Sequence, residues 1–187
     1  MYGETLTAGA RLNGNGEILG HQFEWFLDGF QSEAYGDMEM VSLDPNIEDM
    51  FMYNLNEVYT RRMNIGLKHR ISLANILLLK MEQSIGYKQL TIENERYASF
   101  FEGLYDRELG QPGKLLLSGS GNLLWMPFEH WSFSGGLVYS ERMGNHMELF
   151  GHYIYNYTDG YFYDGNPWLE TERSLNVDLN TTWETDS

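Results

Sequence analysis

The sequence predicts an all-β protein whose strands follow one another in an antiparallel up-and-down meander. Along residues 114–126, 131–142 and 147–157 the side chains alternate between apolar and polar. This period of two is typical of strands that have one apolar face. Aromatic residues make up 15% of the chain and Gly occurs 20 times. These residue types favour strands and turns over helices.

Composition limits the function classes that need to be considered. The 187 residues supply one domain, so residues 1–187 are treated as a single unit. The chain has no Cys, which excludes disulfides, thiolate metal sites and a cysteine nucleophile. No apolar run approaches the roughly 20 residues of a membrane-spanning helix. A net charge of -15 argues against a nucleic-acid partner, because phosphates require a basic surface.

The N-terminal part is expected to form two strands joined by a tight hairpin. The strands cover residues 1–13 and 17–29, and the Asn-Gly-Asn-Gly run at 13–16 is predicted to turn the chain. Gly and Asn tolerate the positive φ that such turns need. Residues 30–50 contain six acidic residues and no Lys or Arg, which predicts an acidic loop.

The middle of the chain is expected to continue the meander. A third strand lies within residues 51–72, and a short connection at 73–75 leads to a fourth strand at 76–92. A helix over residues 76–83 is the alternative, since short apolar runs fit both structures. A second polar segment, residues 93–113, then closes with Gln-Pro-Gly.

Three central strands and a last strand containing Leu175 and Trp183 bring the expected total to about eight strands. A third acidic loop, residues 158–172, precedes the last strand. Short turns and long loops alternate along this meander. The alternation fails at residues 144–146, where a short turn replaces a long loop. Either one strand is misplaced there or one outer loop is tight.

The negative charge is concentrated in the three long loops. Counting Asp and Glu against Lys and Arg, residues 30–50, 93–113 and 158–172 together carry -13 of the total -15. The cost of charge in contact with lipid would keep membrane-crossing strands near neutral. We therefore expect Asp37, Asp106 and Asp164, one in each loop, to lie at one end of the sheet.

Two closed architectures fit a sheet with one apolar and one polar face. A soluble barrel turns its apolar face inward around a ligand, whereas a membrane barrel turns it outward toward lipid. Gly residues in the apolar runs would leave gaps in a soluble core but cost little against fluid lipid. Aromatic residues also gather at strand ends, as in the two girdles of a membrane barrel. The predicted membrane-interface aromatics are Trp125, Phe128, Trp131, Tyr153, Tyr155 and Tyr157.

In a membrane barrel the polar face would line the lumen. The predicted lumen-lining residues are Arg62, Lys68, Arg70, Lys80, Glu82, Lys88, Arg142, Glu148, His152 and Asp178. A lone charge in that position would be costly to desolvate. We therefore expect the following residues to pair across neighbouring strands: Arg62, Lys68, Arg70, Lys80, Glu82, Lys88 and Glu148.

Residues 115–139 carry a resemblance to a known class of proteins. They read as a strand, a Pro-Phe-Glu-His turn and a strand that opens Trp-Ser-Phe-Ser-Gly-Gly-Leu. This hairpin resembles those of Gram-negative outer-membrane β-barrels, in particular large porin-type and conduit barrels, including those that sheathe multihaem cytochromes. The resemblance implies an outer-membrane location, contact with the lipid bilayer and lipopolysaccharide, and a porin, conduit or structural role. Its implied partners are other subunits or a protein enclosed by a larger barrel.

Two features of the chain depart from that class. No export signal precedes the first strand, and the chain closes with Trp-Glu-Thr-Asp-Ser instead of an aromatic residue. A partial sequence of a larger barrel explains both. A conduit also requires a larger barrel, because side chains fill the interior of an eight-stranded one. The rival hypothesis is a soluble, lipocalin-like barrel that binds a small apolar ligand, and an enzyme such as a barrel hydrolase is third.

No constellation of residues predicts catalysis. The five His residues, at positions 21, 69, 130, 146 and 152, do not pair at ligand spacing on a predicted helix. Ser120 lacks the Gly-x-Ser-x-Gly frame of a nucleophile elbow. We expect no catalytic residue, no metal site and no cofactor. Divalent cations bridging the acidic loops to anionic head groups are the one ion class that the charge pattern favours.

Overall fold

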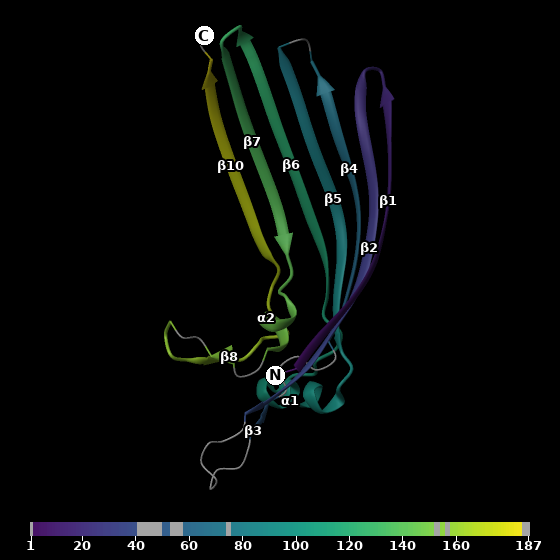
Figure 1. Ribbon diagram of the computed structural model, residues 1–187, viewed down its shortest axis with the longest axis vertical. Coiled ribbons are helices and arrows are strands. Elements are labelled where there is room, and N and C mark those ends of the chain that lie inside the picture. Colours follow the sequence, from purple (N-terminus) through teal and green to yellow (C-terminus); the bar gives the residue numbers. More distant parts are fainter. Residues whose placement is uncertain are drawn as a thin grey trace.

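The computed structural model describes residues 2–40, 50–52, 58–73, 76–151, 154–155 and 158–184. Seven long antiparallel strands form an open sheet in the order β1-β2-β4-β5-β6-β7-β10, and short β3 pairs with β2 (Figure 1). The all-β meander predicted from the sequence is thus confirmed. The strands are β1 (Tyr2–Ile18), β2 (His21–Met40), β3 (Met50–Met52), β4 (Val58–Ser72), β5 (Leu77–Ile92), β6 (Gly113–Phe128), β7 (Trp131–Arg142) and β10 (Glu172–Trp183).

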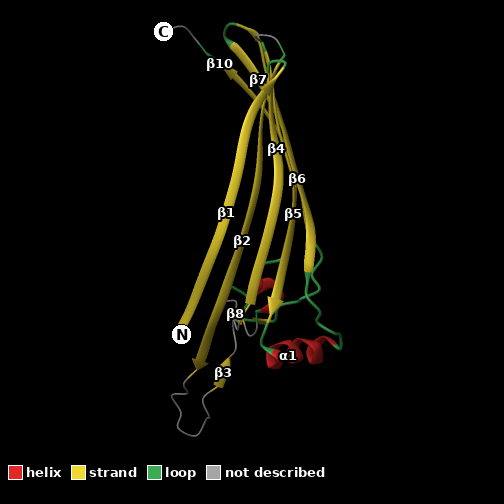
Figure 2. Cartoon of the chain, turned by 90° about the vertical axis from the view of Figure 1, so that its right-hand side faces the viewer, coloured by secondary structure: helices red, strands yellow, loops and turns green. Residues whose placement is uncertain are grey.

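Short and long connections lie at opposite ends of the sheet. The short turns join β1 to β2, β4 to β5 and β6 to β7 at the upper end, which we call the turn end (Figure 1). The lower end, the loop end, holds β3 and two helices, α1 (Glu95–Tyr105) and α2 (His146–Phe150) (Figures 1 and 2). It also holds the small β8 (Ile154–Tyr155) and β9 (Phe162–Tyr163) pair. Asp106 caps α1 and Asp164 follows β9, so both belong to the loop end, as does Asp37 beside β3.

The predicted hairpin turn at residues 13–16 is wrong. These residues lie inside β1, and the chain turns at Leu19 and Gly20, which have φ of 52° and 78°. A Cβ on Gly14 would lie 2.7 Å from the Trp25 indole nitrogen, so this glycine makes room for a ring on the neighbouring strand. Glycine in a strand often marks such a close approach, which sequence alone does not distinguish from a turn.

Other predicted element boundaries also differ from those of the structure. Strand β2 continues to Met40, so half of the first predicted acidic loop is strand, and residues 41–49 lie outside the described part. The third strand begins at Val58, which narrows the broad range predicted for it. The helical alternative for residues 76–83 is wrong, because β5 pairs along its whole length with β4.

The predicted strand at residues 147–157 is also wrong. Asn145 caps α2: its side chain accepts from the Glu148 amide and the Glu148 carboxylate accepts from the Asn145 amide. This reciprocal capping box satisfies two backbone donors and nucleates a helix despite the alternating pattern. The sheet therefore passes from β7 directly to β10 through a long connection. Of the two explanations for the failed alternation, the misplaced strand is the correct one.

The only apolar core found among the described residues lies at the loop end. Helix α1, which the sequence did not predict, begins at the cap Asn94 and packs with α2 against the ends of β4 and β5. No helix in the described part of the chain is long and apolar enough to cross a membrane. The buried core residues are Val58, Leu90, Tyr97, Phe101, Leu109, Met143, Leu149 and Phe150.

Candidate functional site

The two faces of the sheet differ sharply in chemistry. Cross-strand register places Arg62, Lys80 and their alternate neighbours on one side, the polar face, and Ile65 and Val177 on the other, the apolar face. Large side chains of the apolar face are uncovered: Ile65 is 55% exposed and Leu179 is 87% exposed. An apolar surface of this extent marks a contact with lipid or with another apolar partner.

Basic residues are concentrated on the polar face. The chain has 12 Lys and Arg residues, and eight of them lie on this face in the registered strands. They are Arg11, Arg62, Lys68, Arg70, Lys80, Lys88, Lys114 and Arg142. The polar face is also the side that the loop-end core covers, because Val58 and Leu90 share the alternation of Arg62 and Lys88.

Most predicted lumen-lining residues share the polar face. Arg62, Lys68, Arg70, Lys80, Glu82, Lys88, Arg142 and Asp178 all belong to it. Glu148 lies on α2 and not on a strand, because the capping box forms there. His152 lies outside the described residues.

The predicted aromatic groups are only partly on the sheet. Trp125, Phe128 and Trp131 lie at the turn end, where the Trp131 ring is 6.4 Å from that of Trp183. The backbone of Tyr155 belongs to β8, which pairs with β9 and not with the main sheet. Tyr153 and Tyr157 lie outside the described residues.

An aromatic side chain is buried in the middle of the polar face. Phe26 is 6% exposed, and its ring lies over Gly66, its direct partner on β4. The Arg11 guanidinium carbon is 4.8 Å from the ring centroid and the Lys68 ammonium is 5.8 Å from it. Phe26 therefore fills the gap left by a glycine and separates two cations, and both cations gain from the π-system.

Replacing Gly66 with Ala is expected to destabilise the sheet by about 1–3 kcal/mol, the usual cost of overpacking. The added Cβ would overlap the Phe26 ring and lie 3.0 Å from the Gln83 carbonyl oxygen, which cannot move freely. Gly121→Ala is the matched control, because a Cβ there meets nothing within 4 Å. Urea unfolding of both variants measures the difference, and equal stabilities would show that the Phe26 ring does not occupy this place.

The predicted pairing of charges across strands is wrong for Arg62, Arg70 and Lys80, although Lys68 has a partner and Arg142 pairs with Glu172 of the neighbouring strand. Lys68 pairs with Glu24 at 3.9 Å. Arg62, Arg70 and Lys80 have no carboxylate within ion-pair distance among the described residues. The reason is register, since Arg62 lies opposite Lys88 and Arg70 lies opposite Lys80.

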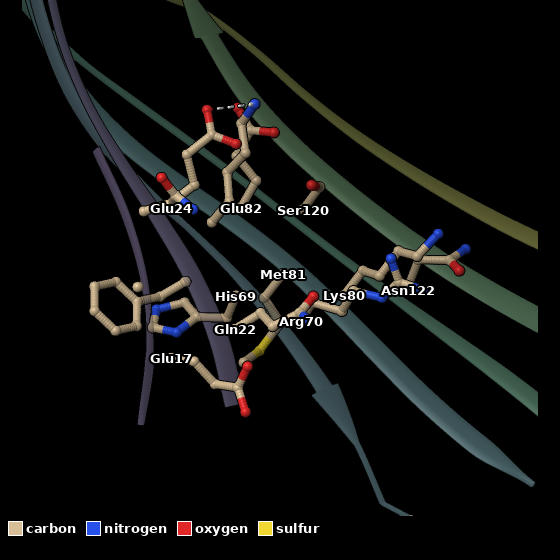
Figure 3. A pocket seen from close by; sticks show the side chains of 14 residues that line it. Glu17, Gln22, Glu24, His69, Arg70, Lys80, Met81, Glu82, Ser120 and Asn122 are labelled. Atoms are coloured by element: carbon tan, nitrogen blue, oxygen red, sulfur yellow. Dashed lines mark ion pairs between the residues drawn. The ribbon is translucent and has the colours of Figure 1, made fainter. Parts of the chain in front are cut away.

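A hollow of about 700 Å³ opens near the turn end (Figure 3). It is lined by side chains from β1, β2, β4, β5 and β6. Figure 3 shows Arg70, Lys80 and Asn122 grouped on one side of it and Glu24 and Glu82 on another. A second hollow of about 380 Å³ shares Gln22 and Arg70 with it.

Polar contacts fasten the loop-end core to the sheet. The Lys88 ammonium donates to the carbonyl oxygen of Gly144 at 3.1 Å, and the Tyr97 hydroxyl donates to that of Phe150 at 2.5 Å. Arg142 binds Glu148 of α2 through two hydrogen bonds of 2.7 and 3.0 Å. The same guanidinium lies 2.8 Å from a Glu172 carboxylate oxygen, so it links β7, α2 and β10.

Two titratable groups of α2 respond to pH in the same direction. The hydrogen bond from Arg142, followed by that from the Asn145 amide, lowers the pKa of Glu148. Burial, followed by the nearby Lys88 charge, lowers the pKa of His146. A lowered pKa means that the unfolded state takes up the proton first. Each contribution to stability is therefore complete above the ordinary pKa and is lost as pH falls below it.

We expect α2 to become less stable as pH falls from 8 to 3, first through His146 and then, below the ordinary pKa of a carboxyl group, through Glu148. Hydrogen exchange of the α2 amides, corrected for intrinsic rates, measures this loss of protection. In His146→Gln only the later step should remain. Protection that rises as pH falls would contradict these contacts.

The described residues contain no group of three or more His, Asp or Glu side chains that could hold a metal ion.

Comparison with known proteins identifies the architecture. No family model matches the chain, and no curated protein matches it. A solved structure described as "Copper transporter OprC" superposes with a TM-score of 0.74 over 98% of this chain, at 12% sequence identity. The match covers 28% of that chain. This likeness shows the fold, an all-β meander that matches a β-barrel or a segment of one.

Proposed function

We propose that this sheet is part of the wall of an outer-membrane β-barrel, with the apolar face toward lipid and the polar face toward an aqueous lumen. The observation that carries the proposal is the uncovered apolar face, on which Val177 and Leu179 are 67% and 87% exposed. Strands β4 and β5 are 15 and 16 residues long, so each is longer than the roughly 9–11 residues that a strand needs to cross a bilayer.

The placement of the helices supports this orientation over a soluble barrel. Helices α1 and α2 cover the polar face at the loop end. Segments that fold back into a membrane barrel must enter the lumen, because irregular backbone does not stand in lipid. In a soluble barrel with a ligand inside, the apolar face would be the interior one.

Strand direction supports a larger barrel. The seven strands of the path alternate in direction, so β1 and β10, at its two edges, run the same way. Two such edges cannot form an antiparallel pair with each other. An all-antiparallel barrel containing this sheet therefore needs an odd number of further strands. A larger barrel also leaves room for an open lumen, which supports a porin or conduit role over a filled barrel.

The loop end would face the outside of the cell, since long loops of outer-membrane barrels are extracellular and short turns are periplasmic. Its acidic segments would lie at the level of anionic lipopolysaccharide. Divalent cations would bridge carboxylates such as Asp106 to those head groups. A protein enclosed by the barrel, or another subunit, would contact the polar face or the open edges.

Membrane reconstitution tests the proposal. We expect the chain to require detergent for solubility and to remain in vesicles after washing with urea. A stable monomer in plain buffer would overturn the membrane assignment and favour the soluble barrel.

The conduit role is tested by planar-bilayer recording of the assembled barrel, in which Lys68→Glu should shift ion selectivity toward cations. An unchanged selectivity would leave the barrel with a structural role.

A further inference from the structure

We propose that Arg70 and Lys80 form a binding site for a small oxyanion, a carboxylate or a phosphate group, at the turn end of the polar face. The site does not depend on the conduit role, because it rests on side chains that the fold itself brings together.

In one register row, Glu17 of β1 lies opposite Gln22, and four polar side chains from Gln22 onward lie next to one another. Gln22 of β2 lies opposite Arg70 of β4, Arg70 opposite Lys80 of β5, and Lys80 opposite Asn122 of β6. Directly opposite residues have Cβ atoms about 4.5–5.5 Å apart, so the two cations are neighbours flanked by two amides. In Figure 3 the side chains of Arg70, Lys80 and Asn122 lie together at one side of the hollow.

The two positive charges are not neutralised by the part of the protein that the structure describes. Like charges directly opposite each other destabilise a sheet. Three carboxylates line the hollow, and none of them forms an ion pair with Arg70 or Lys80. Glu24 pairs with Lys68 at 3.9 Å, and Glu82 lies opposite Lys68 in the register. Glu17 of β1 lies opposite Gln22, two strands away from Arg70. A bound anion would remove the repulsion between Arg70 and Lys80 while leaving that neighbouring row unchanged.

The four side chains match the needs of an oxyanion. A guanidinium presents two parallel N–H donors to the two oxygens of a carboxylate or phosphate, and an ammonium adds a point charge. The amides of Gln22 and Asn122 supply further N–H donors. The hollows of about 700 and 380 Å³ give space for the rest of a small solute, and Arg70 lines both.

A second basic row on the same face provides a contrast. Arg62 lies opposite Lys88, and Lys88 lies opposite Lys114. Here the Lys88 ammonium already donates to the carbonyl oxygens of Met143 and Gly144 at 3.5 and 3.1 Å, so it holds the loop end to the sheet. Arg62 is eight residues from Arg70 on the same strand and face, about 27 Å away. Arg62 is therefore a matched control: replacing it removes a positive charge from the same strand and face but leaves the proposed site intact.

The test is a titration of the full chain in maltoside micelles with inorganic phosphate, and separately with acetate, at constant ionic strength. Calorimetry or phosphorus NMR detects binding. We expect saturable binding of one anion per chain. It should weaken by about tenfold or more in Arg70→Gln and in Lys80→Gln, since each removes a hydrogen bond to a charged group. Arg62→Gln should bind as the unchanged chain does.

Stability separates a binding role from a structural one. Lys80→Gln removes the repulsion with Arg70, so it should unfold at the same or a higher urea concentration while it loses affinity. Adding a short-chain phosphatidylglycerol to the micelles identifies the source of the anion: displacement of phosphate indicates a lipid head group, and its absence indicates a soluble anion. The proposal is overturned by unsaturable binding, or by an equal loss of affinity in the Arg62, Arg70 and Lys80 variants.

Discussion

Val177→Arg is expected to destabilise the membrane-embedded protein by about 2–4 kcal/mol, the cost of an arginine on the lipid face near the bilayer midplane. Val177 lies near the middle of β10 on the apolar face, opposite Leu137 of β7, and is 67% exposed. Urea unfolding of protein folded into lipid vesicles, followed by tryptophan fluorescence, measures the loss.

Asn176→Arg is the matched control. It places the same side chain one residue away on the polar face, opposite Val138. In contact with water it should change stability by no more than about 0.5 kcal/mol. The contrast between adjacent positions removes effects of strand position and of the arginine itself. Equal losses at residues 176 and 177 would contradict the assignment of one face to lipid.

Phe101→Ala is expected to open the loop-end core. The Phe101 side chain is fully buried, and its ring packs edge-on against Tyr97 at 5.2 Å and Phe150 at 6.0 Å. Truncating a buried phenylalanine costs about 3–5 kcal/mol. Amide exchange in α1 and α2 should therefore accelerate by roughly two to three orders of magnitude, up to the limit set by complete local opening.

The sheet should be unaffected by this change, because the core touches only the loop ends of its strands. Exchange at the turn end of β6 and β7 should keep its original rate in Phe101→Ala. Leu104→Ala on the same helix is the control, since Leu104 is 48% exposed. If β6 and β7 lost protection together with α1, the helices and the sheet would form one cooperative unit, contrary to this account.

The strands were predictable because one face of each is apolar, and an alternation of that kind persists whatever the strand packs against. The helices were not. Helix α2 is five residues long, and its capping box at Asn145 and Glu148 competes with an alternating pattern over the same residues. Helix α1 is stabilised by packing of Phe101 on distant segments, which no local signal records.

The candidate site could likewise be predicted only in part, because the face of each residue is a local property whereas its neighbours across strands are not. Period two placed Arg70 and Lys80 on the polar face from sequence alone. The two residues lie side by side because of the register between β4 and β5. Glycine positions do not predict strand register, as the misplaced first turn shows. Side-chain pairing across strands was predicted from the cost of isolated charge. At Arg70 and Lys80 the register instead brings like charges together, and this is the feature that indicates a ligand.

Contact between the apolar face and lipid can be measured through the depth of tryptophan side chains in a bilayer. Trp25 lies on the apolar face and is 45% exposed, whereas Trp168 packs against the loop-end core. Single-tryptophan variants, with the other four replaced by Phe, can be folded into vesicles whose acyl chains carry bromine. If the apolar face contacts lipid, the bromine atoms should quench Trp25 fluorescence strongly and should leave Trp168 fluorescence unchanged. Quenching of Trp25 by aqueous iodide, with no effect of brominated lipid, would contradict this contact.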